Sequence, residues 1–264
     1  MKLTILGSGT SQGVPTIGCQ CEVCRSTDPR DKRLRSSAMV EWDGMRIVID
    51  AGPDFRYQML RAGARSIDAL MLTHSHKDHT GGIDDTRAFN FVDYPKIHRV
   101  QLYATPNAMK TVRKDYDYAF AENKYIGAPE IDVIEFEPGA RIKVSNEEGT
   151  KSVYVEAIRG FHAVGFEITG YRFGDIAYLT DFKSIEPSEI DRLRGVKVLV
   201  VNALRWKEHY SHFNVNEALA LIREVAPERA YLTHSSHDIG LFADINPTLP
   251  DGVELAYDGL EIEI

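Results

Sequence analysis

Hydrophobic and polar positions alternate with a period of two along much of the first half of the chain, as in strands with one buried face. Asp43-Gly44 separates two such runs and is a strong signal for a tight hairpin turn. Asp54 is expected to cap a short helix over residues 55–62, which Gly63 ends. The predicted strands of this half cover residues 2–6, 36–42, 46–49, 67–72 and 100–104.

The second half repeats the alternating pattern and adds helices of period 3.6. Helices are predicted at residues 187–193 and 216–225, and Pro106 opens another that runs to about Tyr118. Two series of strands, each followed by strand–helix alternation, indicate two sheets packed face to face with helices outside. The predicted strands cover residues 131–136, 141–144, 152–158, 166–173, 176–179, 196–201, 229–233, 253–256 and 260–264.

We therefore expect an α/β fold, an αββα four-layer sandwich, formed by residues 1–264 as a single domain. A helical and aromatic insertion is expected around residues 105–130. Its tyrosines and phenylalanines could form a lid over a site, or they could pack the segment onto the core. The sequence slightly favours packing.

The most unusual polar stretch follows the predicted strand at 67–72 and contains three histidines and one aspartate within six positions: His74, His76, Asp78 and His79. Imidazole and carboxylate together suit zinc, manganese or iron. A single ion would struggle to use four ligands so close in sequence, so we expect a two-metal site. The alternative, a histidine-rich surface loop, is improbable because the chain has only nine histidines.

Three later residues are candidates to complete this cluster, because each follows a predicted strand and strand ends meet at one edge of a sheet. We expect one ion on His74, His76 and His162, and a second on Asp78, His79 and His234. Asp181 would bridge the two ions beside a bridging water. Asp50, also at a strand end, either orients a ligand histidine or is a plain turn aspartate.

A second cluster is formed by cysteines. Cys19, Cys21 and Cys24 supply three thiolates at a spacing that can close on one tetrahedral zinc, and His237 is free to supply the fourth ligand. Three buried free thiols, a redox C-x-x-C pair and a solvated histidine are the alternatives. The only three cysteines of the chain cannot form a disulfide framework.

Two further features carry weaker signals. His212 lies in a loop before a helix, which makes it a poor ligand but a plausible proton donor or phosphate contact, with a surface histidine as the alternative. His209 competes for the same role. The glycine-rich stretch 7–13 matches no phosphate-binding motif and is better explained as a tight turn.

Composition and charge limit the partners. A hydrophobic content of 43% and a charged content of 27% are ordinary for a soluble globular protein. A net charge of −8 argues against long nucleic acid but leaves a small phosphate ester open. No stretch is long enough for a membrane span, and the N-terminal apolar run is too short for a signal peptide, so we expect a cytoplasmic protein.

The motif His74-x-His76-x-Asp78-His79, with Asp50 before it and His162, Asp181 and His234 after it, resembles the metallo-β-lactamase superfamily. The stretches 7–15, 18–24 and 232–237 are similar to those of the PhnP-type cyclic-phosphate phosphodiesterases of phosphonate degradation. That resemblance implies the αββα fold, a dinuclear site that favours manganese, and a structural zinc on the cysteines and the last histidine. It also implies that a histidine matching His212 assists phosphate chemistry. Residues 107–137 depart from the family pattern, which leaves the substrate open.

The expected function is therefore a dinuclear metal-dependent hydrolase that cleaves a small phosphodiester, foremost a cyclic one, with Asp78 and His212 as catalytic residues. Its cofactors would be two divalent ions, manganese or zinc, and one structural zinc. Its partner would be a phosphodiester or nucleotide-like substrate, with no long nucleic acid and no membrane, and a homodimer is left open. The alternatives are a thioesterase or lactonase of the same fold, or a non-catalytic metal- or nucleotide-binding module.

Overall fold

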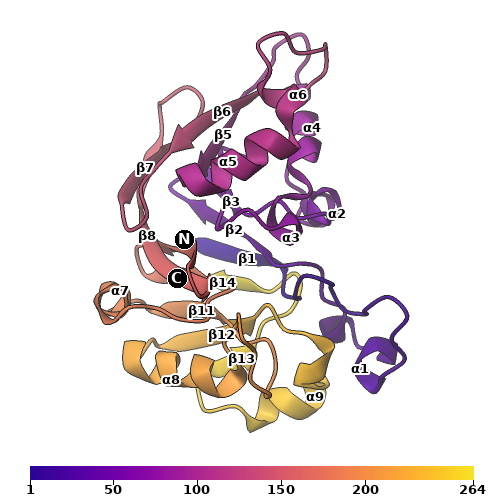
Figure 1. Cartoon of the computed structure of the whole chain (residues 1–264), viewed down its shortest axis with the longest axis vertical. Helices are drawn as coiled ribbons and strands as arrows, with labels where there is room; N and C mark the ends of the chain where they lie inside the picture. The colour runs from indigo at the N-terminus through magenta and orange to yellow at the C-terminus, as the bar shows by residue number, and fades with distance from the viewer.

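The computed structural model describes residues 1–264 and contains two seven-stranded sheets. The first has the order β14-β1-β2-β3-β4-β5-β6, in which β3 to β6 run parallel. The two ends of the protein chain lie side by side at this sheet, since the Met1 amine donates to the Ile264 carbonyl at 3.0 Å (Figure 1). Its strands are β1 (Lys2–Gly7), β2 (Ser37–Trp42), β3 (Met45–Ile49), β4 (Ala69–Met71), β5 (Val100–Ala104), β6 (Ile131–Glu135) and β14 (Glu261–Glu263).

The second sheet has the order β13-β12-β11-β10-β9-β8-β7, in which β10 to β13 run parallel. The carboxyl ends of parallel strands meet at one edge of a sheet, so the loops that follow β4, β10 and β12 can approach one another. Its strands are β7 (Arg141–Ser145), β8 (Ser152–Ala163), β9 (Phe166–Phe173), β10 (Ile176–Leu179), β11 (Val198–Asn202), β12 (Arg229–Thr233) and β13 (Val253–Leu255).

Helices cover the outer faces of both sheets, with α2 and α5 over the first and α7 and α8 over the second (Figure 1). One hydrophobic cluster, which includes Leu3, Ile47 and Tyr178, lies between the sheets, and two more lie under the helices. The expected four-layer αββα sandwich is confirmed. The α-helices are α1 (Glu22–Arg25), α2 (Phe55–Arg61), α3 (Lys77–Thr80), α4 (Arg87–Asn90), α5 (Pro106–Asp115), α6 (Asp117–Phe120), α7 (Pro187–Leu193), α8 (Val215–Val225) and α9 (Phe242–Ile245); the short 3-10 helices are η1 (Pro29–Asp31), η2 (Ile83–Thr86), η3 (His237–Ile239) and η4 (Asn246–Thr248).

Two predictions made from local sequence had opposite outcomes: the hairpin turn at Asp43-Gly44 is confirmed, and the helix cap at Asp54 is wrong. Asp43 and Gly44 have φ of 49° and 71° and join β2 to β3 as a tight hairpin, as predicted. Asp54 does not cap α2: its carboxylate instead accepts from the backbone N–H and the guanidinium of Arg35. The carboxylate that would have capped α2 is used instead in a hydrogen-bonded ion pair with Arg35, a residue distant in sequence.

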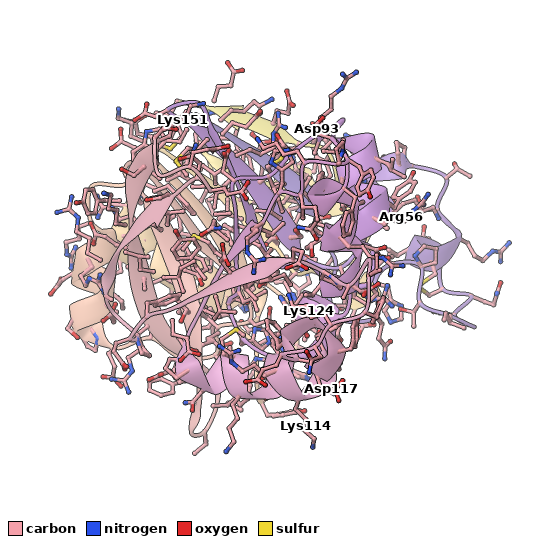
Figure 2. The ribbon with its side chains drawn as sticks, turned by 90° about the horizontal axis from the view of Figure 1, so that it is seen from above. Arg56, Asp93, Lys114, Asp117, Lys124 and Lys151 are labelled. Carbon is pink, nitrogen blue, oxygen red and sulfur yellow. The ribbon has the colours of Figure 1, made fainter.

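The aromatic segment after α5 packs against the body of the protein. The Tyr116 hydroxyl donates to the Thr80 carbonyl at 2.7 Å, and the ring of Tyr118 stacks on Tyr125 with centroids 6.0 Å apart. The predicted single helix is divided at Tyr116 into α5 and α6. Lys114 and Asp117, on these two helices, lie at the periphery when the molecule is viewed from above (Figure 2). None of the helices has the length and apolar character that crossing a membrane requires.

Candidate metal centre

The histidine loop follows β4 and turns directly into a helix. Helix α3 begins at Lys77, immediately after His76. The N–H of His79 donates to the His76 carbonyl at 3.0 Å, which closes the first helical turn. Helix geometry therefore holds Asp78 and His79, while the loop before α3 presents His74 and His76, the latter with extended backbone.

The later candidate ligands arrive from the second sheet. Asp181 follows β10 and His234 follows β12, as predicted, but His162 lies within β8 and not beyond its end. The register between β8 and β9 shifts between Phe161 and Ala163, directly at His162. A bulge of this kind bends a strand and re-aims one side chain, and here it presents the imidazole to the histidine loop.

Three residues of this centre adopt left-handed backbone conformations. The φ angles of Asp50, Asp181 and His234 are 63°, 65° and 55°. Side chains with a Cβ disfavour this region, and such conformations concentrate at functional sites. The backbone is therefore bent out of its preferred conformation at these strand ends, where side chains are turned toward a common centre.

The seven side chains converge in overlapping sets. In each of three sets, His74/His76/His162, Asp78/Asp181/His234 and His74/His79/Asp181, the ligating atoms all lie within 4.8 Å of one another. His74 Nε2 and His79 Nε2 are buried and make no hydrogen bond of good geometry, although two carboxylate oxygens lie 3.1 Å from His79 Nε2. Buried polar nitrogens are almost always paired, so two that point into a carboxylate-lined centre fit bound cations.

The pKa values of these groups are shifted in the direction that metal binding needs. Burial lowers the pKa of His74, His76 and His162, and it lowers that of His234 to about 3. These imidazoles are therefore neutral near pH 7 and keep a lone pair for a metal. Burial opposes ionisation of Asp181, but His234 and His79 hold the pKa of this carboxyl well below its usual range.

His79 differs from the other histidines because carboxylates surround it. Its Nε2 lies 3.1 Å from Asp78 Oδ2 and 3.1 Å from Asp181 Oδ2, and its Nδ1 lies 2.6 Å from Asp50 Oδ2. Burial alone would lower the pKa of His79, yet these three carboxylates raise it well above the usual value. The centre thus attracts positive charge strongly, which a divalent cation would supply.

Asp50 contacts His79 and is itself held in place by Thr73. Its Oδ1 accepts from the N–H of Thr73 at 2.8 Å, and its Oδ2 accepts from the Thr73 hydroxyl at 2.8 Å. The same Oδ2 faces His79 Nδ1, which leaves Nε2 of that ring directed at the centre. Carboxylate partners of this kind fix the orientation of a ligand histidine and raise its basicity.

Replacing Asp50 with asparagine should weaken metal binding about tenfold to a hundredfold, because the ring of His79 loses its charged partner. Competition with a chelator of known affinity, followed by measurement of bound metal, would quantify this. Asp132→Asn is the matched control, since Asp132 lies on β6, away from the centre, and pairs with Arg99. Equal metal affinity in Asp50→Asn and the unmodified protein would contradict a role for Asp50.

His212 borders the centre from the loop that precedes α8. Its Nε2 lies 3.1 Å from Asp181 Oδ1, and its Nδ1 lies 3.1 Å from both Ser211 Oγ and His209 Nδ1. Asn214 and Glu217 form a capping box at the start of α8, which fixes the end of this loop. His209 and His212, the two candidates for the role of proton donor or phosphate contact, are therefore direct neighbours.

A cavity of about 430 Å³ opens onto the centre. Its floor includes His76, Asp78, His162, Asp181 and His212. The other lining residues come from the turn after β1, from the loop before α8 and from the segment after β12: Thr10, Ser11, Gln12, Thr16, Leu204, Arg205, His209, Tyr210, Ser211, Ser236, His237 and Asp238.

The cysteine cluster lies beside this cavity. His237 Nδ1 lies 3.4 Å from Cys19 Sγ and 3.2 Å from Cys21 Sγ, and the ligating atoms of these residues and Cys24 all lie within 4.8 Å of one another. The hydrogen bond with His237 lowers the pKa of Cys21 to about 6, while burial raises that of Cys24 to about 11. Three thiols and one imidazole at this spacing suit tetrahedral zinc.

Some residues that contact the proposed metal ligands were not predicted from the sequence. His234 Nδ1 lies 3.0 Å from Ser36 Oγ, and its Nε2 lies 3.3 Å from Thr10 Oγ1, so two N-terminal hydroxyls hold this ring. Serine and threonine are too common for their positions to be informative. The Thr180 hydroxyl donates to the Asp181 carboxylate at 2.7 Å. Of these three residues, only Thr180 could have been predicted, because it lies at the end of a strand directly before a candidate ligand.

Comparisons with known proteins place the chain in a family and show its relatives. A family model described as a Beta-lactamase superfamily domain matches residues 45–235. A solved structure of a new diphosphatase from the PhnP family is 39% identical, with a TM-score of 0.89 and coverage of 100% of this chain and 97% of that one. Zinc-bound PqqB from Methylobacterium extorquens is 20% identical, with a TM-score of 0.74 and coverage of 100% of both chains. The octanoyltransferase of Porphyromonas gingivalis is 40% identical over 99% of this chain, which spans only 51% of that protein.

Proposed function

Because the chain belongs to the beta-lactamase superfamily and shares the fold of a PhnP-family diphosphatase, we propose that it is a metal-dependent hydrolase of small phosphodiesters. The observation that carries the proposal is the convergence of seven histidine and aspartate side chains on one centre, four of which line an open cavity. A cyclic phosphodiester is the first candidate substrate, and a small diphosphate diester is the second, because the solved relative is a diphosphatase.

Two divalent ions, manganese or zinc, fit this ligand set. His74, His76 and His162 would hold one ion, Asp78, His79 and His234 the other, and Asp181 would lie between them. When bound, such ions lower the pKa of a water molecule and neutralise charge on a phosphoryl group. The cysteines with His237 would hold a separate structural zinc.

His212 is positioned to supply the proton that the leaving oxygen needs. His209 Nδ1 already accepts from the N–H of Ser211 at 3.3 Å, so the hydrogen between the two histidine rings belongs to His212. His212 Nε2 lies beside the Asp181 carboxylate at the wall of the cavity. From there a protonated His212 would donate to a departing alkoxide.

Replacing His212 with alanine should lower kcat about a hundredfold to ten-thousandfold, the usual size of proton-transfer assistance. Metal content should stay unchanged, because the seven proposed ligands remain. His98→Ala is the matched control, since His98 pairs with Asp93 and Glu147 away from the cavity. Unchanged turnover in His212→Ala would remove this residue from the mechanism.

The proposed function is tested by measuring metal content on protein purified without chelator and then assaying bis(p-nitrophenyl) phosphate, a thioester and a lactone with added manganese. About three metals per chain and phosphodiester cleavage would support the proposal. Cleavage of the thioester or lactone alone would retain the metal centre and change the reaction. A chain without metal and without turnover of any of them would overturn it.

The relationship to an octanoyltransferase does not alter this proposal. This chain spans only about half the length of that protein. We assign the acyl transfer to the half that this chain does not match. Expression of the two halves of that relative as separate proteins would test the assignment, since only the unmatched half should transfer an octanoyl group.

A further inference from the structure

Two adjacent serines are buried where the second strand of the first sheet begins. Ser36 directly precedes β2 and is 1% exposed, and Ser37 is the first residue of β2 and is fully buried. Buried strand positions normally carry apolar side chains, and a buried hydroxyl costs free energy unless it is hydrogen-bonded. Consecutive side chains of an extended chain point in opposite directions, so the two hydroxyls reach different parts of the molecule.

Ser36 joins His234 to the turn that follows β1. Its Oγ lies 2.9 Å from the Gly9 carbonyl oxygen and 3.0 Å from His234 Nδ1, closer to this nitrogen than Thr180 Oγ1 at 3.3 Å or Asp181 Oδ2 at 3.2 Å. A hydroxyl has one hydrogen and a carbonyl can only accept. Both contacts are therefore hydrogen bonds when Ser36 donates to the carbonyl and accepts from an Nδ1–H, which leaves the lone pair of the ring on Nε2.

The carbonyl that Ser36 contacts belongs to a fixed turn. The N–H of Gly9 donates to the Leu34 carbonyl at 2.8 Å. The N–H of Gly13 donates to the Thr10 carbonyl at 2.8 Å and closes the turn, so the tight turn predicted for the glycine-rich stretch is confirmed. Ser36 therefore holds the imidazole against backbone that is itself hydrogen-bonded in place.

Ser37 holds the backbone of the residue that contacts His79. Its Oγ lies 2.9 Å from the carbonyl oxygens of both Ile49 and Asp50, which are on either side of the Asp50 Cα. Asp50 has a φ of 63°, and its carboxylate contacts His79 Nδ1 at 2.6 Å. A left-handed conformation at a residue with a Cβ persists where the surroundings enforce it, and the Ser37 hydroxyl bonds both sides of this bend.

We propose that Ser36 and Ser37 are positioning residues for the second of the two proposed ions, the one assigned to a site with His79 and His234. Ser36 acts on His234 directly, and Ser37 acts on His79 through Asp50. This inference rests on the proposed function, because it assigns a role within the same centre. Partners that orient a ligand ring raise metal affinity without touching the metal.

A merely structural role predicts a different behaviour. If Ser36 only fastened the turn after β1 to β2, its loss would lower thermal stability and leave the ratio of the two metal affinities unchanged. A positioning role predicts instead that the second ion alone is bound less tightly. Neither serine hydrogen-bonds with the ligands assigned to the first ion, which are His74, His76 and His162.

The test measures manganese binding and not turnover. Each protein is treated with a mild chelator that leaves the proposed cysteine-bound zinc, and it is then titrated with manganese while free and bound Mn²⁺ are followed by electron paramagnetic resonance. The unmodified protein should bind two ions, whose neighbouring spins give a coupled signal. In Ser36→Ala the affinity for the second ion should fall about tenfold to a hundredfold, and the signal of a single ion should dominate at low manganese. Ser37→Ala should weaken the same ion by a smaller factor, because it acts through Asp50.

Reference variants identify which ion is lost. His76→Ala removes a ligand of the first ion and Asp78→Ala a ligand of the second, and Ser36→Ala should reproduce the Asp78→Ala pattern in weaker form. Ser36→Thr keeps the hydroxyl and should recover most of the affinity. Thr86→Ala is the matched control, since the buried Thr86 hydroxyl donates to the Ile83 carbonyl at 2.7 Å and bonds none of the proposed ligands.

The outcomes separate this inference from the proposed function. Equal manganese affinities in Ser36→Ala and the unmodified protein, or equal losses for both ions, would overturn the positioning role. Binding of fewer than two manganese ions by the unmodified protein would overturn it as well. Two bound ions without cleavage of any phosphodiester would instead overturn the proposed function, while a selective loss of the second ion in Ser36→Ala would still support the serines as positioning residues.

Discussion

Replacing Asp181 with alanine should reduce kcat/KM about a thousandfold or more and lower the metal content of the active site. The carboxylate lies within 3.2 Å of His212 and of His79 and His234, which we assign to the second ion. It also lies within 4.8 Å of the ligating nitrogens of His74 and His162, which we assign to the first ion. Its loss would remove a shared ligand and several kcal/mol of charge stabilisation. Steady-state kinetics with manganese, together with elemental analysis, would measure both effects.

Two variants separate this effect from general damage. Asp175→Ala removes an exposed aspartate from the neighbouring β9–β10 hairpin and should leave activity and metal content unchanged. Asp181→Asn keeps the shape of the side chain but not its charge, so it should resemble Asp181→Ala in activity while folding normally by circular dichroism. Full activity and full metal content in Asp181→Asn would refute a bridging carboxylate.

Replacing Cys21 with serine should lower the melting temperature by about 10 °C, which corresponds to a few kcal/mol for a domain of this size. The zinc proposed for this cluster would tie the α1 segment, which stands out beside the body in Figure 1, to η3. Without that tie, few apolar contacts hold the segment, since only Val14, Val23 and Cys24 form its buried cluster. Thermal unfolding with and without a chelator would measure the change.

Gln20→Ser is the matched control for the cysteine variant. Gln20 is exposed and lies between two of the cysteines, so the control introduces the same residue into the same loop. It should melt like the unmodified protein and retain one zinc that resists mild chelation. Equal melting temperatures for Cys21→Ser and Gln20→Ser would show that no stabilising zinc is bound there.

The parts of this centre that the sequence predicts are those encoded by neighbouring residues. The histidine loop is recognisable because four potential ligands lie within six positions, and the β2–β3 hairpin because Asp43-Gly44 suits left-handed backbone. The layering followed from the two series of strands with alternating hydrophobic positions, whereas the strand order was not predicted. Each of these signals depends on a short stretch of chain and on no distant partner.

Features that depend on distant contacts could not be predicted. The bulge that presents His162 is a mismatch between β8 and β9, and neither strand shows it alone. Asp54 looks like a helix cap but bonds to Arg35 from another loop.

The left-handed backbone at Asp50, Asp181 and His234 makes stability and activity compete for the same positions. Each such residue stores on the order of 1–3 kcal/mol of strain that a glycine would largely release. A screen that rewards only heat resistance would therefore enrich substitutions at these sites and produce a robust but inert protein. Thermostable variants of this fold should accordingly be selected under a simultaneous requirement for turnover, with these three positions held fixed.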